Sequence, residues 1–323
     1  MKLLRRQFLH LAAGAAALPA AAQIAWAQTY PTRPVRIIVG LPAGSSSDIG
    51  ARLMGQWLSE RLGQPLVIEN RPGAGQNLAA EAVVRAPPDG YTLLLSNTAN
   101  ATNPALYDKL NFNFIRDITP VAGIIRVPQV MLVNPSVPTK TVPAFIAYAK
   151  ANPGKINMAS VGIGSAQHIA GELFKFMAGV DMVHVPYRSN PRPDLFGGQV
   201  QVMFDTIPSS IEFIRTGKVR ALAVTTSSRY QGLLDIPTVG EFLPGYEASA
   251  WQGIGAPTNT PEGIIEMLNK EINAGLADSK LKAKLADLGA LPMPMTPAEF
   301  GRLIADETEK WSTVVKFAGI KPE

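Results

Sequence analysis

The sequence contains no cysteine and only three histidines, and charged residues make up just 17% of it. The absence of cysteine excludes a disulfide scaffold, a Cys-ligated zinc or iron–sulfur centre, and thiol catalysis. One of the three histidines lies within the first ten residues, so a His-rich metal site is also disfavoured. We therefore expect neither a metal nor a cofactor.

Motifs of common catalytic sites are missing as well. The chain has no G-x-x-x-x-G-K-[ST] P-loop, no G-x-S-x-G nucleophile elbow and no H-E-x-x-H pair. Gly73-Ala74-Gly75 follows an expected strand and precedes an expected helix, as in a dinucleotide fingerprint. Leu78 occupies the position of the third glycine, so we interpret the segment as a tight turn before a helix. The sequence favours a binding protein over an enzyme.

Apolar residues are plentiful enough for a sizeable core. The 323 residues are 46% hydrophobic, which suits one large or two medium domains. Aromatic residues amount to only 7%, while 28 glycines and 27 prolines indicate many turns between short elements.

Residues 1–27 are typical of a secretory signal peptide. Three of the first six residues are Lys or Arg, residues 8–22 are mainly apolar, and Ala25-Trp26-Ala27 is a small-x-small cleavage signal. We expect cleavage before Gln28 and a periplasmic mature protein. The sequence Arg-Arg-Gln-Phe-Leu at residues 5–9 favours the twin-arginine route, and an ordinary Sec leader is the alternative.

Removing the leader also lowers the net charge. The formal value of +5 falls to +2, because 27 basic and 25 acidic residues remain. No stripe of Lys and Arg with interleaved aromatics follows, so nucleic acid is not an expected partner. No later segment reaches about 18 unbroken apolar residues, so we expect a mature protein that does not span a membrane.

Short apolar runs alternate with helical patterns along the mature chain, which indicates an α/β fold. We expect strands at residues 35–39, 66–69, 92–96, 121–125, 130–133, 157–160, 182–185, 200–204, 219–224 and 251–256. The C-terminal part is expected to be helical. There, Thr260-Pro261 and Thr296-Pro297 each place a capping residue before a proline at the first helical position.

Two of the expected helices have recognisable features. Ser46 or Ser47 is a plausible cap of the helix that follows the first strand, with Asp48 in its first turn. In the helix after residue 165, an apolar face is expected to contain Ile169, Leu173, Phe176 and Met177.

Two loops, residues 42–48 and 160–165, share one physical design. Each joins an expected strand to an expected helix and is rich in Gly and Ser. Glycine allows close approach to the backbone, serine adds uncharged donors, and a helix N-terminus adds free N–H groups at the positive end of a dipole. Such loops bind anions without Lys or Arg. Two of them, in separate α/β sets, predict an anion held between two lobes.

Four further side chains are candidates for the same site. His168 follows the second loop and either points to the ligand or is structural. His184 lies in an apolar strand and is interpreted as structural. Arg188 is a possible ligand clamp, and Asp205 at a strand end either binds the ligand or fixes a loop.

The ordered set of short motifs resembles the Bug-type solute receptors of tripartite tricarboxylate transporters. The matching stretches run through nearly the whole mature chain. They are Tyr30-Pro31-Thr32-Arg33-Pro34, Pro42-Ala43-Gly44 with Asp48 and Arg52, Val67-Ile68-Glu69-Asn70-Arg71-Pro72-Gly73-Ala74-Gly75, Asp89-Gly90-Tyr91-Thr92-Leu93, Asn103-Pro104-Ala105-Leu106-Tyr107, Gly164-Ser165-Ala166-Gln167-His168, Val185-Pro186-Tyr187-Arg188 and Gly197-Gly198-Gln199-Val200.

The resemblance implies a two-lobed, Venus-flytrap periplasmic-binding-protein fold of type II, with a cleft between the lobes and two hinge-crossing strands. It places lobe 1 at residues 28–128 plus 251–323 and lobe 2 at residues 129–250. The hinges are expected near residues 125–131 and 249–253.

The resemblance also implies that the two loops hold a ligand carboxylate from opposite lobes. With the candidates above, the expected ligand-binding residues are Ala43, Gly44, Ser45, Ser46, Ser47, Asp48, Asn97, Thr98, Ser160, Val161, Gly162, Gly164, Ser165, His168, Arg188 and Asp205.

The chain departs from the family pattern in three places. Ser45 and Gln76 stand where the family often has glycine, and residues 189–193 replace a Gly-x-x-Pro-Ala-like stretch. The ligand-facing wall of the second lobe is therefore expected to differ, and ligand identity is not transferred.

We predict an exported, monomeric receptor that captures a small carboxylate and presents it to the membrane permease subunits of a tripartite tricarboxylate transporter. Dicarboxylates, tricarboxylates, amino acids and aromatic carboxylates all suit the loops. A periplasmic sensor that docks on a signalling partner is the alternative, followed by an exported enzyme.

Overall fold

The computed structural model describes residues 30–107, 109–187 and 190–321. The expected leader with its cleavage site lies outside the described residues, and so does the expected clamp Arg188. Among the described helices, none combines the length and the apolar character needed to cross a membrane.

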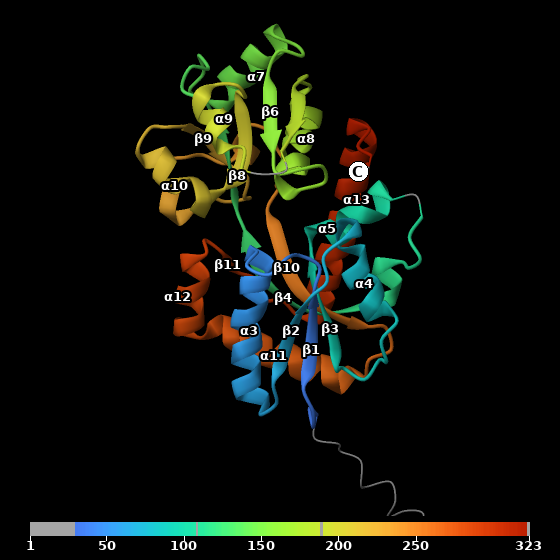
Figure 1. Cartoon of the computed structure of the whole chain (residues 1–323). Helices are drawn as coiled ribbons and strands as arrows, with labels where there is room; N and C mark the ends of the chain where they lie inside the picture. The colour runs from blue at the N-terminus through green and yellow to red at the C-terminus, as the bar shows by residue number, and fades with distance from the viewer. Residues whose placement is uncertain (1–29, 108, 188–189, 322–323) are drawn as a thin grey trace, which may run out of the picture.

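Two mixed β-sheets form two lobes (Figure 1). The first sheet has the strand order β11-β4-β10-β3-β1-β2. Here β1 pairs in parallel with β2 and β3, whereas β10 runs antiparallel to β3 and β4. Its strands are β1 (Val35–Val39), β2 (Leu66–Asn70), β3 (Thr92–Asn97), β4 (Ile118–Val127), β10 (Ala250–Pro257) and β11 (Leu291–Pro292).

The second sheet has the order β7-β6-β8-β5-β9. Its strand β6 pairs in parallel with β7 and β8, and β5 runs antiparallel to β8 and β9. Its strands are β5 (Gln129–Val133), β6 (Asn157–Ser160), β7 (Val183–Pro186), β8 (Val202–Thr206) and β9 (Arg220–Val224). The α/β class and the two-lobed arrangement predicted from the sequence are confirmed.

Helices surround both sheets (Figure 1). Those between strands of the first sheet, or after its last long strand, are α3 (Ser46–Leu62), η1 (Ala74–Gln76), α4 (Asn77–Val84), α5 (Thr98–Leu106), α6 (Phe114–Asp117), α11 (Glu262–Ala277), α12 (Ser279–Asp287) and α13 (Pro297–Ala318). Those of the second lobe are α7 (Val142–Ala151), α8 (Ala166–Ala178), α9 (Arg192–Gly197), α10 (Ile207–Arg215), η2 (Gln231–Leu233) and η3 (Val239–Glu241).

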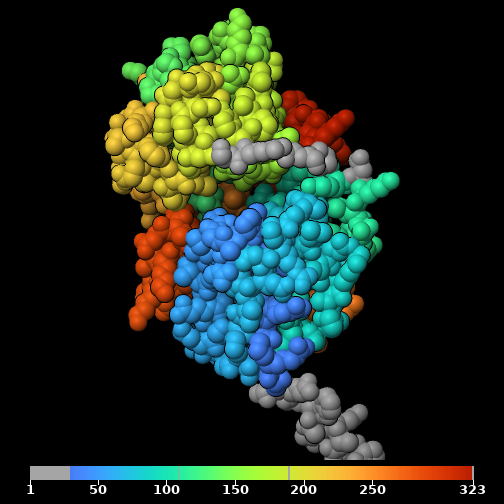
Figure 2. Space-filling model, in the orientation of Figure 1, coloured from blue at the N-terminus to red at the C-terminus, as the bar shows by residue number. Residues whose placement is uncertain are grey.

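The chain passes from the first sheet to the second at Pro128, between β4 and β5, and returns at the start of β10. Figure 2 shows the two lobes as distinct masses that meet along a narrow line. The segments that cross this line are short, which is the geometry that permits one lobe to rotate against the other.

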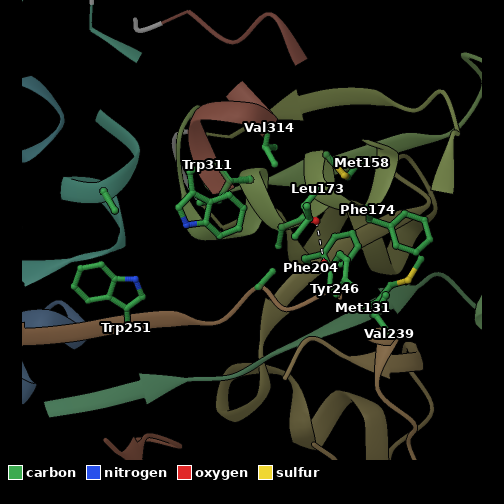
Figure 3. Close-up of a cluster of buried hydrophobic side chains, with 14 of the residues drawn as sticks. Met131, Met158, Leu173, Phe174, Phe204, Val239, Tyr246, Trp251, Trp311 and Val314 are labelled. Carbon is green, nitrogen blue, oxygen red and sulfur yellow. Dashed lines mark hydrogen bonds between the residues drawn. The ribbon is translucent and has the colours of Figure 1, made fainter. Parts of the chain in front are cut away.

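The C-terminal helix packs on both lobes. Helix α13 contacts α5 and β4 in the first lobe and α8 in the second. Trp311 and Val314 of α13 belong to a buried cluster that also contains Leu173 and Phe174 of α8 (Figure 3). An apolar core therefore runs across the line between the lobes.

A charged network connects the two crossings to α13. Arg126 of β4 pairs with Glu247, which lies just before β10, at 2.5 Å. Lys310 of α13 bonds to both Glu247 and Glu307. The buried Glu307 carboxylate also accepts the indole N–H groups of Trp251 in β10 and Trp311, at 3.2 and 2.7 Å.

The cap of α3 differs from the expectation. Ser45, rather than Ser46 or Ser47, is the cap, and its Oγ accepts the backbone N–H of Asp48 at 3.2 Å. The helix therefore begins at Ser46, one residue earlier than a Ser46 cap would give, because any of three consecutive serines satisfies the capping chemistry.

Two other local predictions are wrong. The buried face of α8 is centred on Ile169, Leu173 and Phe174, so Phe176 falls outside it, remains 42% exposed and packs on Phe317 of α13. Helix α11 begins at Glu262, with the preceding proline as its cap residue. The cap predicted at Thr296, with proline at the first helical position, is confirmed, and Glu299 completes a capping box.

Candidate functional site

Four strand-to-helix junctions lie between the lobes, where β1 leads into α3, β3 into α5, β6 into α8 and β8 into α10. The first turns of α3, α5 and α8 line one cavity of about 370 Å³. We call it the proximal chamber; its defining residues are Ser46, Ser47, Thr98, Ala99, Ala166 and Gln167. First-turn N–H groups have no acceptor within their own helix, so the chamber is bordered by main-chain donors and three positive dipole ends.

The first loop is held by a buried carboxylate. Asp48 accepts the backbone N–H of Gly44 at 2.9 Å, the Arg52 guanidinium at 2.9 Å and the Asn70 amide at 3.0 Å. The hydrogen bond from Arg52, helped by the Gly44 and Asn70 bonds, lowers the pKa of Asp48 to about 2 although burial opposes this. Asp48 is therefore charged at neutral pH, and its oxygens are occupied by bonds that hold the loop. Ala43, in the same loop, is exposed.

The junction of β3 and α5 is fixed by a capping box. The Asn97 side chain accepts the Ala99 N–H at 2.9 Å, and its own backbone N–H donates to Asn100 at 2.9 Å. Its Nδ2 donates to Gln76 Oε1 at 2.5 Å. Thr98 Oγ1 accepts the backbone N–H of Trp251 at 3.1 Å, which connects the start of α5 to β10.

The second loop closes on itself through its serines. Ser160 is buried, and its Oγ accepts the Gly162 N–H at 3.1 Å and lies 2.7 Å from His184 Nε2. Ser165 caps α8 by accepting the His168 N–H at 3.3 Å, and it donates to the Gly162 carbonyl at 2.7 Å. The N–H groups left for a ligand are then those of the first α8 residues.

His168 lies behind this loop. The imidazole is 3% exposed, its Nδ1 accepts the Gly164 N–H at 3.0 Å, and its ring stacks on His184 at 3.6 Å. Its Nε2 lies 3.6 Å from Glu172, which also pairs with Lys175 at 2.9 Å. These contacts support the structural alternative for His168.

Two ionisable groups in this cluster have shifted pKa values. Burial, followed by the proximity of His168, lowers the pKa of His184 to about 4, so His184 is neutral at pH 7. Burial disfavours the charged form of Glu172, but bonds to His168 and Lys175 outweigh it and lower the pKa of Glu172. Glu172 is therefore charged at neutral pH, behind the loop.

Asp205 is likewise occupied by protein groups. It is fully buried and accepts two bonds from Arg192, at 2.6 and 3.1 Å. It also accepts the Thr206 N–H at 2.8 Å and the Ser210 hydroxyl at 2.7 Å. Of the two roles left open by the sequence, these contacts favour fixing the start of α10.

Two further cavities adjoin the proximal chamber. The distal chamber, of about 590 Å³, shares with it Gln76, Ala99, Val161, Gly164 and Ser165. The side chamber, of about 450 Å³, shares with it Ser46, Val127, Gln167 and Thr206. The three together form one elongated cleft between the lobes.

The expected residues divide into two sets by position. Those that line the proximal chamber are Ser46, Ser47, Asn97, Thr98, Val161, Gly164 and Ser165, while Gly162 lines the distal chamber and Asp205 the side chamber. Gly44, Ser45, Asp48, Ser160 and His168 make the hydrogen bonds that hold the loops in place.

Several wall residues were missed by the sequence analysis. They are Gln76, Ala99, Ala166, Gln167, Thr206, Trp251 and Gln252. Ala99, Ala166 and Gln167 lie one or two residues after capping residues, so the rule that first-turn amides face the same way as the cap would have found them. Trp251 and Gln252 lie more than 80 residues from either loop and carry no local signal.

The family model described as "Tripartite tricarboxylate transporter family receptor" (TctC) matches residues 51–320. This chain belongs to that family. The TctC assignment confirms the resemblance read from the motifs, and with it a solute-binding receptor rather than an enzyme.

Individual TctC relatives agree over nearly the full length. Protein BugT of Bordetella pertussis is 37% identical over 300 residues, which cover 91% of this chain and 92% of BugT. The solved structure of "R. palustris Rpa4515 with adipate" is 37% identical, covers 91% of this chain and all of that one, and has a TM-score of 0.77. That of periplasmic binding protein BugD is 33% identical, covers 91% and 100%, and has a TM-score of 0.73.

Proposed function

We propose that this TctC receptor captures a small carboxylate in the proximal chamber and delivers it to the permease subunits of its transporter. The observation that supports this is the convergence of three helix N-termini, two from the first lobe and one from the second, on one chamber. The relative solved with adipate supports a carboxylate as the ligand class.

The available interactions are strong enough for capture. A helix dipole contributes about 0.3–1 kcal/mol, up to about 2 when partly buried, and a hydrogen bond to a charged group about 1.5–3 kcal/mol. A few such bonds reach the roughly 8 kcal/mol of a micromolar complex after the cost of closing the cleft.

Closure of the cleft links capture to delivery. We place lobe 1 at residues 28–128 plus 251–323, lobe 2 at 129–250, and the hinges at 125–131 and 249–253, because the chain changes sheets at Pro128 and at the start of β10. A ligand that binds both lobes favours the closed state in proportion to its differential affinity for that state. The closed receptor, acting as a monomer, is the form that docks on the permease.

The place of action is the periplasm. The leader at residues 1–27 directs export, with the twin-arginine route favoured by its Arg-Arg pair. The relative BugD is described as a periplasmic binding protein, which supports the same location.

Substitution by proline at the first helical position tests whether backbone N–H groups bind the carboxylate. Proline removes one N–H and is well tolerated at this position, and both preceding residues, Ser45 and Ser165, already have the extended backbone it requires. S46P and A166P should each lower carboxylate affinity about tenfold, since one charge-assisted bond is lost. Isothermal titration calorimetry against a panel of carboxylates measures this.

The matched control is S279P, at the first position of α12 and outside the chamber wall, with an extended residue before it. It should bind like the unmodified protein. The proposal fails if no carboxylate binds, or if S46P and A166P both bind as tightly as the control.

A further inference from the structure

The distal chamber bears on the identity of the carboxylate, an inference that rests on the proposed function. The distal chamber is larger than the proximal chamber. It opens from the end of the proximal chamber that lies away from the α3 N-terminus. A ligand longer than the proximal chamber extends into the distal or the side chamber, and the distal chamber offers the larger volume. Its walls then decide which far ends are accepted.

Those walls expose two large apolar side chains beside their polar groups. Val161 and Ile163 are 44% and 37% exposed although both are large and apolar, and both line the chamber. Leu106 at the end of α5 and Tyr107, which follows that helix, also line the chamber, and a Cβ at Gly75 would meet the Tyr107 hydroxyl at about 2.5 Å. Apolar groups left in contact with water at a cleft are available to bind apolar ligand surface.

Two polar side chains of the wall spend their donors on neighbouring protein groups. The Tyr187 hydroxyl donates to Asp194 at 2.6 Å, which leaves the ring as its free surface. Asn103 donates to the Gly75 carbonyl at 2.7 Å and to Asn77 at 2.8 Å. Neither residue has a donor to spare for a second carboxylate.

Cationic groups are also occupied. Among the described residues that line the three chambers, Arg192 in the side chamber is the one cationic side chain, and it forms an ion pair with Asp205. Asp287 lines the same side chamber, so its charge balance is negative. A second carboxylate buried at either end of the cleft would lose its hydration, and none of the described wall residues would supply an unpaired cation in return.

Gln76 stands at the junction of the proximal and distal chambers. Its backbone is left-handed, with φ 77°, a conformation that costs energy for a residue with a Cβ and that persists mainly at functional sites. Its Oε1 is fixed by the bond from Asn97, and the described residues offer no acceptor to its Nε2. That amide is therefore free to donate to a ligand.

We propose that the ligand is a monocarboxylate with an uncharged, apolar far end. The carboxylate lies in the proximal chamber, the far end lies in the distal chamber against Ile163 and Val161, and Gln76 donates a hydrogen bond to the carboxylate so that the ligand extends toward the distal chamber. Gln76 and Ile163 are then the residues that set specificity.

Calorimetry with four probes tests the ligand class. 3-Phenylpropanoate and hexanoate should bind at least tenfold more tightly than adipate, and 3-phenylpropan-1-ol should not bind. Adipate binding as tightly as hexanoate overturns this inference and leaves the proposed function intact. Failure of every carboxylate, or equal binding of the alcohol, overturns both.

A change of charge at Ile163 tests the distal wall directly. I163K introduces an ammonium group into the distal chamber, so adipate affinity should rise at least fivefold relative to hexanoate. L234K, at a 61%-exposed leucine away from the three chambers, adds the same net charge and should leave the ratio unchanged. An unchanged ratio in I163K contradicts the assignment.

Glycine at position 76 separates recognition from stability. Glycine adopts φ 77° freely, so Q76G should keep or raise the melting temperature while 3-phenylpropanoate affinity falls at least fivefold. N259G relieves the same kind of backbone at φ 66°, in the turn between β10 and α11, and should keep full affinity. Unchanged affinity in Q76G overturns the role of this residue.

Discussion

At the scale of single residues, two buried carboxylates hold the loops of the cleft in place. Asp48 holds Gly44 and the start of α3, and Asp205 holds the start of α10. Each carboxylate is buried, and its oxygens accept from several protein donors. The uncharged first-turn amides are thereby kept in position by carboxylates that are bonded within the protein.

Replacing Asp48 should weaken the fold in a pH-dependent way. Its folded pKa of about 2 lies below the ordinary value of 3.8, so its contribution is fully present above pH 3.8 and is lost as pH falls through 2. D48N should lower the free energy of unfolding by about 1–2 kcal/mol at pH 7, since Arg52 is half exposed and the pair is partly screened.

Urea denaturation at several pH values measures this. The gap between D48N and the unmodified protein should narrow between pH 5 and pH 2. D306N, at an exposed acid on α13, is the matched control and should show no such gap. A gap that stays constant down to pH 2 would contradict the role of this carboxylate.

At the scale of elements, the strands were predictable because most are short, buried apolar runs bounded by turns. The expected strands at residues 35–39 and 157–160 match β1 and β6. The cap of α3 was missed because three serines in a row satisfy the same chemistry. Phe176 was misplaced because the buried face of α8 is chosen by the elements it meets, including α13 from the far end of the chain.

The candidate site was likewise predictable where its chemistry is local and not where it depends on tertiary packing. The two Gly/Ser loops were recognisable because their chemistry is local, and the structure places them at one chamber. Gln76, Trp251 and Gln252 come from other parts of the sequence, and only the packing of β10 and η1 brings them to that chamber. Backbone conformation, such as the left-handed Gln76, is equally invisible in a residue pattern.

Helix α13 bonds to residues at the return crossing between the lobes, through Glu307 to Trp251 and through Lys310 to Glu247. Glu307 accepts bonds from two buried indoles and from Lys310, so E307Q replaces one acceptor oxygen with a donor in a buried network. We expect a loss of about 2–4 kcal/mol in the free energy of unfolding. Chemical denaturation measures it, with E309Q, an exposed position on the same helix, as the control. Equal stability of the two variants would count against the network.

At the scale of the whole molecule, the lobes also touch away from the crossings. Gly289, between α12 and β11, lies against Pro208 at the start of α10, so that a Cβ at position 289 would come within about 1.6 Å of the proline ring. This contact closes the cleft at the side chamber, opposite the distal chamber.

G289A should therefore hold the lobes apart. The added methyl group collides with a stiff ring, so we expect a larger radius of gyration by small-angle X-ray scattering and a loss of ligand affinity of at least fivefold, although no chamber residue changes. G319A carries the same left-handed backbone strain, at φ 60°, with nothing near the new methyl. If both variants scatter and bind alike, the contact has no part in closure.

The proposed use of backbone amides to bind the carboxylate of the ligand has an evolutionary consequence. An amide N–H is present whatever side chain a residue carries, so mutations in the walls leave this hold in place as long as the three helices begin where they do. Substitutions that change specificity are then free to occur at side chains of the distal chamber such as Ile163, which we propose to contact the other end. A receptor of this kind can then change its ligand specificity by single substitutions. Each step keeps the interaction with the carboxylate, the group that all these ligands share.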